Sequence, residues 1–393
     1  MVPQVELKAR RQQLFQRMKQ CHKNSVAILF AAPEVRRNRD VFYPYRQDSD
    51  FYYLSGLDEP ESVMVLIPER VGGKVVLFCR GKDPEKEQWE GVRLGPIGAR
   101  RTLGVDDSYP MSELEKVMPS LLEGKEYIYY SLADESFKDA HILAWVAGAK
   151  KKVRTGVGSP MGLLSLDSLL HEMRLIKSPY EIKMMRYAAF IAVAAHFNAM
   201  KSVRVGLMEY EVEANILRDF ISLGASSPAY GSIVAGGANA CILHYRNNNQ
   251  KLKNGDLLLI DAGAEYQYYA SDITRTFPVN GRFSPEQKAL YQLVLQAQKA
   301  AIKVIKPGVS WNKPHEKTVQ VLTAGLVKLG LLKGNPKELI KKGAYRRFYM
   351  HRTGHWLGMD VHDVGEYKVN AEWRTFEPNM VFTVEPGLYI SPN

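Results

Sequence analysis

Two aspartates in one apolar stretch most constrain how this chain can fold. The stretch runs from Leu257 to Phe277 and has two β-favouring segments around a short polar centre, which predicts a two-stranded hairpin. With the turn at 266–267, Asp261 lies directly opposite Asp272, with Cβ atoms roughly 4.5–5.5 Å apart. Two carboxylates this close in an apolar sheet cannot both stay ionised without a cation between them. If the two carboxylates do oppose each other, the hairpin predicts a cation site.

Two other interpretations remain open for the hairpin taken alone. One aspartate could face solvent, or a bulge could shift the register and separate the two carboxylates. Neither arrangement needs a cation, so the remaining sequence has to decide between them.

Composition and charge exclude several classes of protein. The chain has 393 residues, enough for two or three domains, and its longest apolar run, 188–195, is too short to span a bilayer. The N-terminus lacks the apolar segment of a signal peptide. The three cysteines, Cys21, Cys79 and Cys241, are widely spaced and odd in number, which argues against a disulfide framework and against a cysteine zinc site. We expect a cytoplasmic protein.

The formal net charge of +11 comes from short, scattered clusters of lysine and arginine. No nucleic-acid-binding motif accompanies these clusters. We therefore expect neither a nucleic acid nor a membrane as partner, and interpret most of the charge as solvated surface.

The order of predicted elements indicates two domains. Residues 1–172 alternate short apolar strands (26–30, 63–67, 75–78 and 127–130) with helices (4–20, 111–122 and 137–147), which predicts an α/β domain with a mostly parallel or mixed sheet. Residues 173–393 combine long helices with β-like runs at 231–235, 240–245, 257–277, 349–364 and 380–390, which predicts an α+β domain. Two capping boxes, Ser178-Pro-Tyr-Glu181 and Ser284-Pro-Glu-Gln287, mark helix starts in this domain.

The second domain also holds most of the candidate catalytic residues. Besides the two aspartates, these are His244, His351, His355, His362 and Glu385. A single buried histidine is more often a hydrogen-bonded core residue than a ligand, but an ionisable Glu385 in an apolar segment needs a partner. Gly354 and Gly358 disfavour a helix through the histidines, and His355 and His362 can meet only if the chain bends at Gly358.

The ligand types favour a hard metal ion. Several carboxylates with one imidazole suit Mn²⁺ better than a cysteine-type zinc site. Two such ions about 3.5–4 Å apart would neutralise paired carboxylates and bridge a hydroxide.

Several motifs resemble one known family. They are His-Trp-Leu-Gly-Met-Asp-Val-His-Asp-Val-Gly at 355–365, Val-Glu-Pro-Gly-Leu-Tyr at 384–389, Tyr-Pro-Tyr-Arg-Gln-Asp-Ser-Asp-Phe at 43–51, and the segment around Trp89. Together they resemble the pita-bread metallopeptidases, in the aminopeptidase P (Xaa-Pro aminopeptidase) subgroup. The resemblance covers nearly the whole chain. It implies a creatinase-like α/β N-terminal domain, an α+β pita-bread catalytic domain, and a homodimer or homotetramer.

The resemblance also implies residue roles. Asp261 would bind one Mn²⁺, Asp272 would bridge two, His355 would bind the second, and Glu385 would be both a ligand and the group that moves a proton. Substrate contacts would come from His244, His351, His362, Tyr389, Asp40 and Trp89, with Trp89 reaching in from a neighbouring subunit. His244 and His362 would stabilise the developing oxyanion.

One part of the family pattern is absent from the sequence. The family has a second bridging glutamate on a later strand, whereas this sequence ends at Asn393. We therefore expect the C-terminal strand and the fifth ligand to be missing, which makes the second metal site doubtful.

These observations predict a metal-dependent aminopeptidase that removes the N-terminal residue from peptides with proline second, through attack of a metal-bridging hydroxide. One alternative is a dipeptidase acting on Xaa-Pro, a prolidase, because the ligand set is shared. The other is a non-catalytic pita-bread protein that binds peptides or proteins, which the missing fifth ligand would favour.

Overall fold

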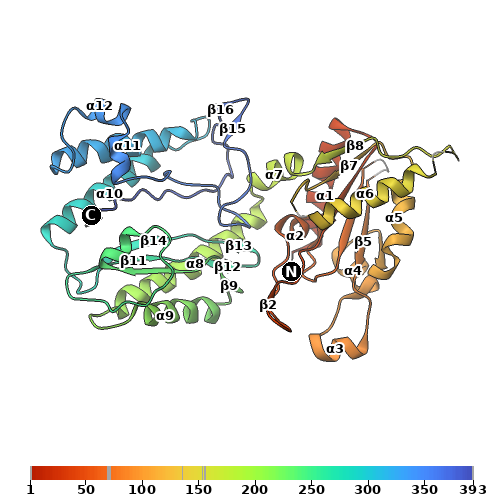
Figure 1. The fold of residues 1–393 in the computed structure, drawn as a ribbon, viewed down its shortest axis with the longest axis horizontal. Coiled ribbons are helices and arrows are strands. Elements are labelled where there is room, and N and C mark those ends of the chain that lie inside the picture. Colours follow the sequence, from red (N-terminus) through yellow and green to blue (C-terminus); the bar gives the residue numbers. More distant parts are fainter. Residues whose placement is uncertain (1, 69–71, 135, 153, 155, 392–393) are drawn as a thin grey trace. The chain divides into compact units, whose positions relative to one another are not determined.

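The computed structural model describes residues 2–68, 72–134, 136–152, 154 and 156–391. The chain divides into two compact units, Met1–Met173 and Arg174–Asn393, which are taken one at a time below (Figure 1). Across the described residues, no helix combines the length and the apolar character needed to cross a membrane.

Unit 1 is built on one six-stranded mixed sheet, as predicted. Its strands β1, β4 and β5 pair antiparallel, whereas β5–β6, β1–β7 and β7–β8 pair parallel, giving the order β6-β5-β4-β1-β7-β8. The strands of this sheet are β1 (Ser25–Phe30), β4 (Val63–Ile67), β5 (Lys74–Cys79), β6 (Asp107–Pro110), β7 (Tyr127–Tyr130) and β8 (Gly162–Ser165), and β2 (Arg36–Asn38) with β3 (Val41–Phe42) forms a separate hairpin.

Helices cover both faces of this sheet, which is why every residue of its central strands β1 and β4 is buried. Alternate strand residues such as Ile28 and Val65 join a core with Met118 and Trp145 of two helices. The helices of unit 1 are α1 (Gln4–Cys21), α2 (Ser49–Ser55), α3 (Pro84–Glu90), α4 (Gly95–Leu103), α5 (Leu114–Leu122) and α6 (Ser136–Lys150), with the short η1 (Met111–Glu113); α7 (Asp167–Leu175) runs into unit 2.

Unit 2 contains two helix pairs and several small sheets. Helices α8 and α9 pack on β10, β11 and β12 around a core that includes Ile191, Phe220 and Ile260 (Figure 1). Its helices are α8 (Pro179–Ser202), α9 (Glu209–Ser222), α10 (Pro285–Val304), α11 (Asn312–Lys328) and α12 (Pro336–Lys341), with η3 (Gly237–Cys241) and η4 (Ala344–Arg347). Its strands are β9 (Ser227–Pro228), β10 (Ile233–Gly236), β11 (Leu257–Asp261), β12 (Ala264–Tyr266), β13 (Tyr269–Ala270), β14 (Thr274–Pro278), β15 (Lys368–Val369) and β16 (Glu372–Trp373).

Both predicted capping boxes are present. The Ser178 hydroxyl accepts from the Glu181 N–H while Glu181 accepts from the Ser178 N–H, and Ser284 and Gln287 do the same at the start of α10. Each helix therefore begins where the sequence predicts it, with proline at its first position.

Three predicted β-like runs have other structures. Residues 240–245 do not form a strand, because η3 continues to Cys241 and the chain then turns. The runs at 349–364 and 380–390 contain no regular strand, yet their backbones pair antiparallel: Leu357, Thr383 and Glu385 donate to Val381, His355 and Thr353. An isolated bridge joins Trp356 to Phe382 in the same register.

Candidate metal centre and active site

The hairpin that carries the two aspartates exists, but its register differs from the prediction. Asp261 pairs with Thr274, and Tyr266 pairs with Tyr269. The turn is therefore Gln267-Tyr268, one residue later than predicted, and both turn residues have positive φ, 51° and 69°. The prediction that Asp261 directly opposes Asp272 is wrong.

The two aspartates nevertheless share one face of the hairpin. Moving the turn by one residue shifts the cross-strand partner by two, from Asp272 to Thr274, and residues two apart on a strand point the same way. Asp272 is thus a diagonal neighbour of Asp261, a relationship still within side-chain reach.

The Tyr230 hydroxyl lies between the two carboxylates. It is 2.5 Å from Asp261 Oδ1 and 2.9 Å from Asp272 Oδ1. Burial, followed by the charges of both aspartates, raises the Tyr230 pKa well above its usual value, so the hydroxyl keeps its proton to donate. Sequence reasoning missed this tyrosine, because nothing near residue 230 links it to a site 31 residues away.

Three of the predicted ligands meet in one cluster. Single donor atoms of Asp272, His355 and Glu385 all lie within 4.8 Å of one another. His355 Nε2 is 3.1 Å from Asp272 Oδ2 and 3.1 Å from Glu385 Oε1. The fourth predicted ligand, Asp261, is joined to this cluster through Tyr230.

The charges of the cluster need a cation. Burial, followed by the neighbouring Asp272, raises the pKa of Asp261 to about 7. Burial lowers the pKa of His355, but its hydrogen bonds with Asp272 and Glu385 outweigh this and raise the value to about 10. Without a bound metal, a protonated His355 would place a positive charge between the carboxylates.

His355 is oriented from its other ring nitrogen. Nδ1 lies 2.9 Å from the Trp356 carbonyl oxygen, which leaves Nε2 directed at the two carboxylates. This arrangement is typical of histidines that bind a metal through Nε2.

The chain bends between His355 and His362, as the sequence required. The two rings lie 4.2 Å apart between centroids, and no helix forms in this segment. Partial desolvation, followed by the neighbouring His355, lowers the pKa of the exposed His362. A neutral His362 can donate one N–H and accept at its other nitrogen.

Close backbone pairing aligns His355 with Glu385. A Cβ on Gly354 would lie 2.0 Å from the Thr383 carbonyl oxygen, so only glycine allows the two segments to approach. The Thr383 hydroxyl donates to Glu385 Oε1 at 2.7 Å and accepts from the His355 N–H at 3.0 Å. The hydroxyl of Thr383 therefore bonds both His355 and Glu385. The sequence alone did not identify Thr383 as part of the site.

The other histidines of unit 2 lie at different distances from the cluster. His351 Nε2 is 3.0 Å from the Tyr389 hydroxyl, which makes these two predicted substrate contacts a pair. His244 lies on an exposed turn, near enough to His362 to lower the pKa of His362.

The residue after His244 is held by a buried carboxylate. Tyr245 donates to Glu209, which is fully buried and also accepts from the Gly236 N–H.

The remaining predicted substrate residues belong to unit 1. Asp40 is exposed at the turn of the β2–β3 hairpin, and Trp89 on α3 is 89 % exposed. Within unit 1, both side chains are therefore open to solvent.

The donor set fits a divalent metal. Asp261, Asp272 and Glu385 offer carboxylate oxygens, His355 offers an oriented imidazole nitrogen, and burial together with the neighbouring carboxylates raises the pKa of Asp261. A bound cation would remove that repulsion and displace the proton held by His355. This supports the cation-site interpretation of the hairpin over the alternatives left open by its sequence.

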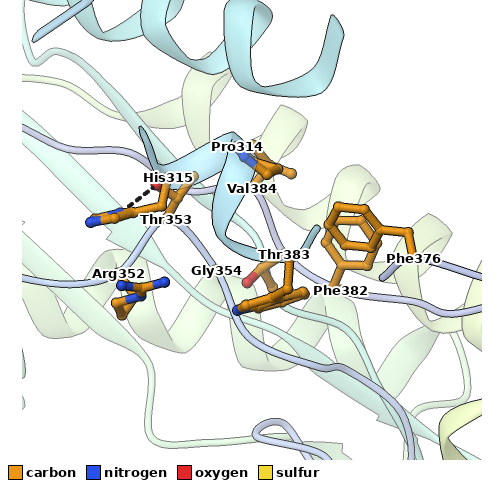
Figure 2. Close-up of a pocket in the computed structure, with 10 residues that line it drawn as sticks. Pro314, His315, Arg352, Thr353, Gly354, Phe376, Phe382, Thr383 and Val384 are labelled. Atoms are coloured by element: carbon orange, nitrogen blue, oxygen red, sulfur yellow. Dashed lines mark hydrogen bonds between the residues drawn. The ribbon is translucent and has the colours of Figure 1, made fainter. Parts of the chain in front are cut away.

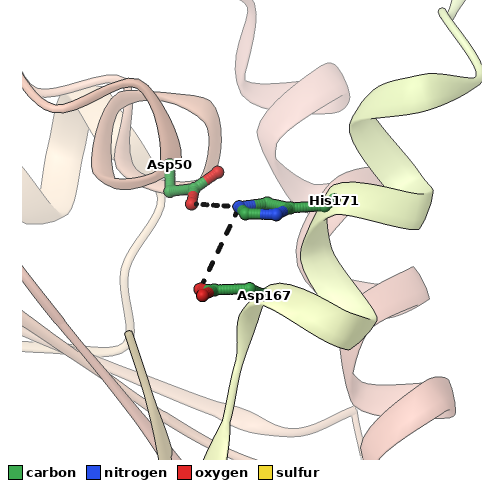
Figure 3. A group of neighbouring side chains, drawn as sticks. All are labelled: Asp50, Asp167 and His171. Carbon is green, nitrogen blue, oxygen red and sulfur yellow. Dashed lines mark hydrogen bonds and ion pairs between the residues drawn. The ribbon is translucent and has the colours of Figure 1, made fainter. Parts of the chain in front are cut away.

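A second cluster of possible ligands lies in unit 1. His171 Nε2 is 3.0 Å from Asp50 Oδ2 and 4.0 Å from Asp167 Oδ1 (Figure 3). Asp167 also accepts from the Ser131 hydroxyl. These contacts make an ion-pair group that joins α2 to α7, and they account for the proximity of the three side chains without a metal.

A small cavity lies beside the segment that leads to His355. Its lining includes His315, Thr353 and Phe382 (Figure 2). Its interior of about 20 Å³ has room for one water. His315 Nδ1 and the Tyr349 hydroxyl both bond the Thr353 hydroxyl, at 3.0 and 2.7 Å. The cavity wall therefore supports the segment that leads to His355.

Comparisons with known proteins identify the family of this chain. Residues 183–393 match the family described as metallopeptidase family M24, and residues 7–129 match the aminopeptidase P N-terminal domain. The chain is 43% identical to the Xaa-Pro aminopeptidase of Escherichia coli K12, over all of this chain and 88% of that protein.

Solved structures give the same result. The aminopeptidase PepP of Pseudomonas aeruginosa superposes with a TM-score of 0.97 at 55% identity, covering 100% of this chain and 88% of that one. A zinc-substituted E. coli aminopeptidase P in complex with product has a TM-score of 0.96 at 43% identity, with the same coverage. The predicted two-part fold is confirmed, and the chain belongs to the aminopeptidase P group of metallopeptidase family M24.

Proposed function

We propose that this protein removes the N-terminal residue from peptides that have proline in the second position. The observation that carries the proposal is the meeting of Asp272, His355 and Glu385, with Asp261 joined through Tyr230, inside a chain similar over its whole length to Xaa-Pro aminopeptidases. The substrate complex solved for E. coli aminopeptidase P, at 43% identity, adds support for a peptide substrate.

We further propose that Asp261, Asp272, His355 and Glu385 hold Mn²⁺. Three carboxylates and one imidazole are hard ligands, which supports Mn²⁺ over a soft-ligand metal. When bound, the metal would polarise a carbonyl and make water a nucleophile at neutral pH.

Glu385 would move the proton in this reaction. Its Oε1 accepts from the Thr383 hydroxyl, which fixes the carboxylate, and its side chain is 35 % exposed, which leaves it open to water and substrate. It can therefore take a proton from water and pass it to the leaving proline nitrogen.

The accessory histidines would bind the scissile peptide. His362, with its lowered pKa and its ring against His355, can donate an N–H to the carbonyl oxygen as negative charge develops there. His244 would assist at the same oxygen, and the His351–Tyr389 pair would line the substrate site.

Asp40 and Trp89 would complete the substrate site in an oligomer, with Trp89 supplied by a neighbouring subunit. The 89 % exposure of this large aromatic side chain supports such a role, because exposed tryptophans are enriched at interfaces. We expect a homodimer or homotetramer, which mass photometry measures directly. The three free cysteines support a reducing, cytoplasmic location.

One assay tests the activity. The protein is incubated with Mn²⁺ and an Xaa-Pro-Yaa tripeptide, an Xaa-Pro dipeptide or a proline-free tripeptide. Release of Xaa from the proline tripeptide, lost in Glu385→Gln but kept in the exposed control Glu338→Gln, supports the proposal. Cleavage of the dipeptide alone would assign a prolidase. No cleavage together with no metal binding would assign a peptide-binding protein.

A further inference from the structure

Three charged side chains are almost entirely buried next to the bend between His355 and His362. The side chains of Asp363 and Lys177 are each 1 % exposed, and that of Arg174 is 3 % exposed. Asp363 Oδ2 is 2.8 Å from Lys177 Nζ, and its Oδ1 is 2.6 Å from Arg174 Nη2. The same Arg174 nitrogen is 2.7 Å from Asp360 Oδ2, so the network reaches both acidic residues of the bend.

Burial of these charges is poor support for a purely stabilising role. Removing three charges from water is costly, and apolar residues of similar volume often stabilise a core as well or better. What the charges do provide is one fixed geometry, because each oxygen of Asp363 has its own cationic partner. The fixed carboxylate, Asp363, directly follows His362 in the segment that carries the proposed catalytic histidines.

The Asp363 carboxylate fills the inside of the bend. A Cβ on Gly358 would lie 2.0 Å from Asp363 Oδ2 and 3.0 Å from Lys177 Cε. On its other side, the Gly358 carbonyl accepts from the Ala270 N–H at 2.8 Å, in the hairpin two residues before Asp272. The bend is therefore held between the ion network and the strand that leads to a proposed metal ligand.

The backbone of Asp363 reaches His355 through a shared acceptor. The Trp356 carbonyl oxygen accepts from the Asp363 N–H at 3.0 Å and lies 2.9 Å from His355 Nδ1. The neighbour of Asp363 in sequence is His362, whose ring lies 4.2 Å from that of His355. A movement of Asp363 would consequently shift the acceptor that orients one histidine and the backbone that carries the other.

We infer that Asp363, clamped by Arg174 and Lys177, is a positioning residue that sets the placement of His355 and His362. This inference rests on the proposed peptidase function for its catalytic meaning. It assigns to the buried network the role of fixing the active-site bend.

The test separates positioning from stability with two variants. Asp363→Asn leaves two buried cations with one fewer anion and destabilises the chain. Asp363→Asn/Lys177→Met removes one charge of each sign, so Arg174 still has Asp360, and most of the stability returns. In both variants we expect kcat per folded molecule and Mn²⁺ affinity to fall roughly 10–100-fold with KM changed less than about threefold. Leu326→Ala, a buried truncation in α11, is the control for lost stability alone.

The outcomes are distinct. If the double variant regains wild-type kcat and Mn²⁺ affinity along with its stability, or if Leu326→Ala loses as much kcat as Asp363→Asn, the inference is overturned. Mn²⁺ affinity is measured by chelator competition without any peptide. It therefore tests positioning even if the wild-type protein cleaves none of the three peptides, an outcome that would count against the proposed function alone.

A glycine variant tests the same geometry from the other side. Gly358 has an ordinary φ, so alanine there acts through its contact with Asp363 and Lys177. We expect Gly358→Ala to lower kcat and Mn²⁺ affinity at least tenfold, and its crystal structure to show His362 displaced from His355. The control Gly148→Ala, whose Cβ meets nothing within 4 Å, should leave both constants unchanged. An unchanged His355–His362 separation with full activity in Gly358→Ala would contradict the inference.

Discussion

Asp261 and Asp272, which are diagonal rather than directly opposite neighbours in the hairpin, are joined by a single hydroxyl, that of Tyr230. This one donor bonds Oδ1 of both carboxylates, and its burial together with their charge raises its pKa and keeps it protonated. Two acids that would otherwise repel each other thus share a neutral bridge in the metal-free chain.

Tyr230→Phe should destabilise the metal-free protein by about 1–3 kcal/mol, because a buried carboxylate loses a hydrogen bond without gaining another partner. Chemical unfolding in a chelator measures this change. Tyr210→Phe, at a side chain 52 % exposed, is the control. Equal stability of Tyr230→Phe and wild type would show that the hydroxyl does not hold the two acids.

Adding Mn²⁺ to the chelated protein should raise its stability, because the metal binds the folded state and relieves the repulsion that raises the pKa of Asp261. At a free metal concentration a hundred times Kd, the gain should be about 2.7 kcal/mol. Thermal unfolding against Mn²⁺ concentration measures it. Asp272→Asn should abolish the gain and Glu338→Gln should retain it; a gain of full size in Asp272→Asn would place the metal elsewhere.

Glu209→Gln should cost about 1–3 kcal/mol and loosen the turn that carries His244. The buried Glu209 accepts from the N–H groups of Gly236 and Gln250 and from the Tyr245 hydroxyl, and an amide would present N–H groups to these donors. Urea unfolding and steady-state kinetics measure the two effects. Glu211→Gln, on the same helix, is the comparison, and an equal loss there would remove the special role of Glu209.

The stability of the protein should fall as pH drops from 7 to 5, with His315 as one source. Burial, followed by the charges of Arg352 and His351, lowers the pKa of His315 to about 4. Below about pH 6.5 the unfolded chain binds a proton that the folded chain does not, so protonation favours unfolding. Between pH 7 and pH 5, the free energy of unfolding of His315→Gln should fall by about 1–2 kcal/mol less than that of the wild type. This figure is discounted for the partial exposure of His315. Parallel pH curves, measured by urea unfolding in a chelator, would contradict this.

The sequence predicted features that depend on neighbours along the chain. Ser178 and Ser284 cap their helices as expected, because a capping box is complete within four residues. The bend between His355 and His362 also follows from local constraints, since two residues of opposite parity cannot meet on a straight strand.

The turn register could not be read from sequence in the same way. Gln267 and Tyr268 both adopt positive φ, a conformation for which asparagine, aspartate and glycine are the usual signals. Without that signal, the turn was placed one residue early. The metal-site prediction does not depend on this error, because both aspartates still lie on one face.

Contacts between distant segments left no sequence signal at all. Tyr230 is 31 residues from Asp261, and Lys177 is 186 residues from Asp363. In the sequence, Lys177 after a helix cannot be told from a surface lysine. Only the structure shows that it is buried and paired with Asp363. The sequence supplied candidate residues for the chemistry, whereas the contacts that hold them in place required the structure.

Gly358 and Asp363 compete for the same volume, so neither position can vary alone over evolutionary time. A larger side chain at 358 becomes acceptable only if residue 363 shortens or withdraws, and Lys177 would then be left with a buried charge. Substitutions at 177, 358 and 363 should therefore occur jointly among homologues or be absent. We therefore expect the three residues to be inherited together, although Lys177 lies 186 residues from Asp363.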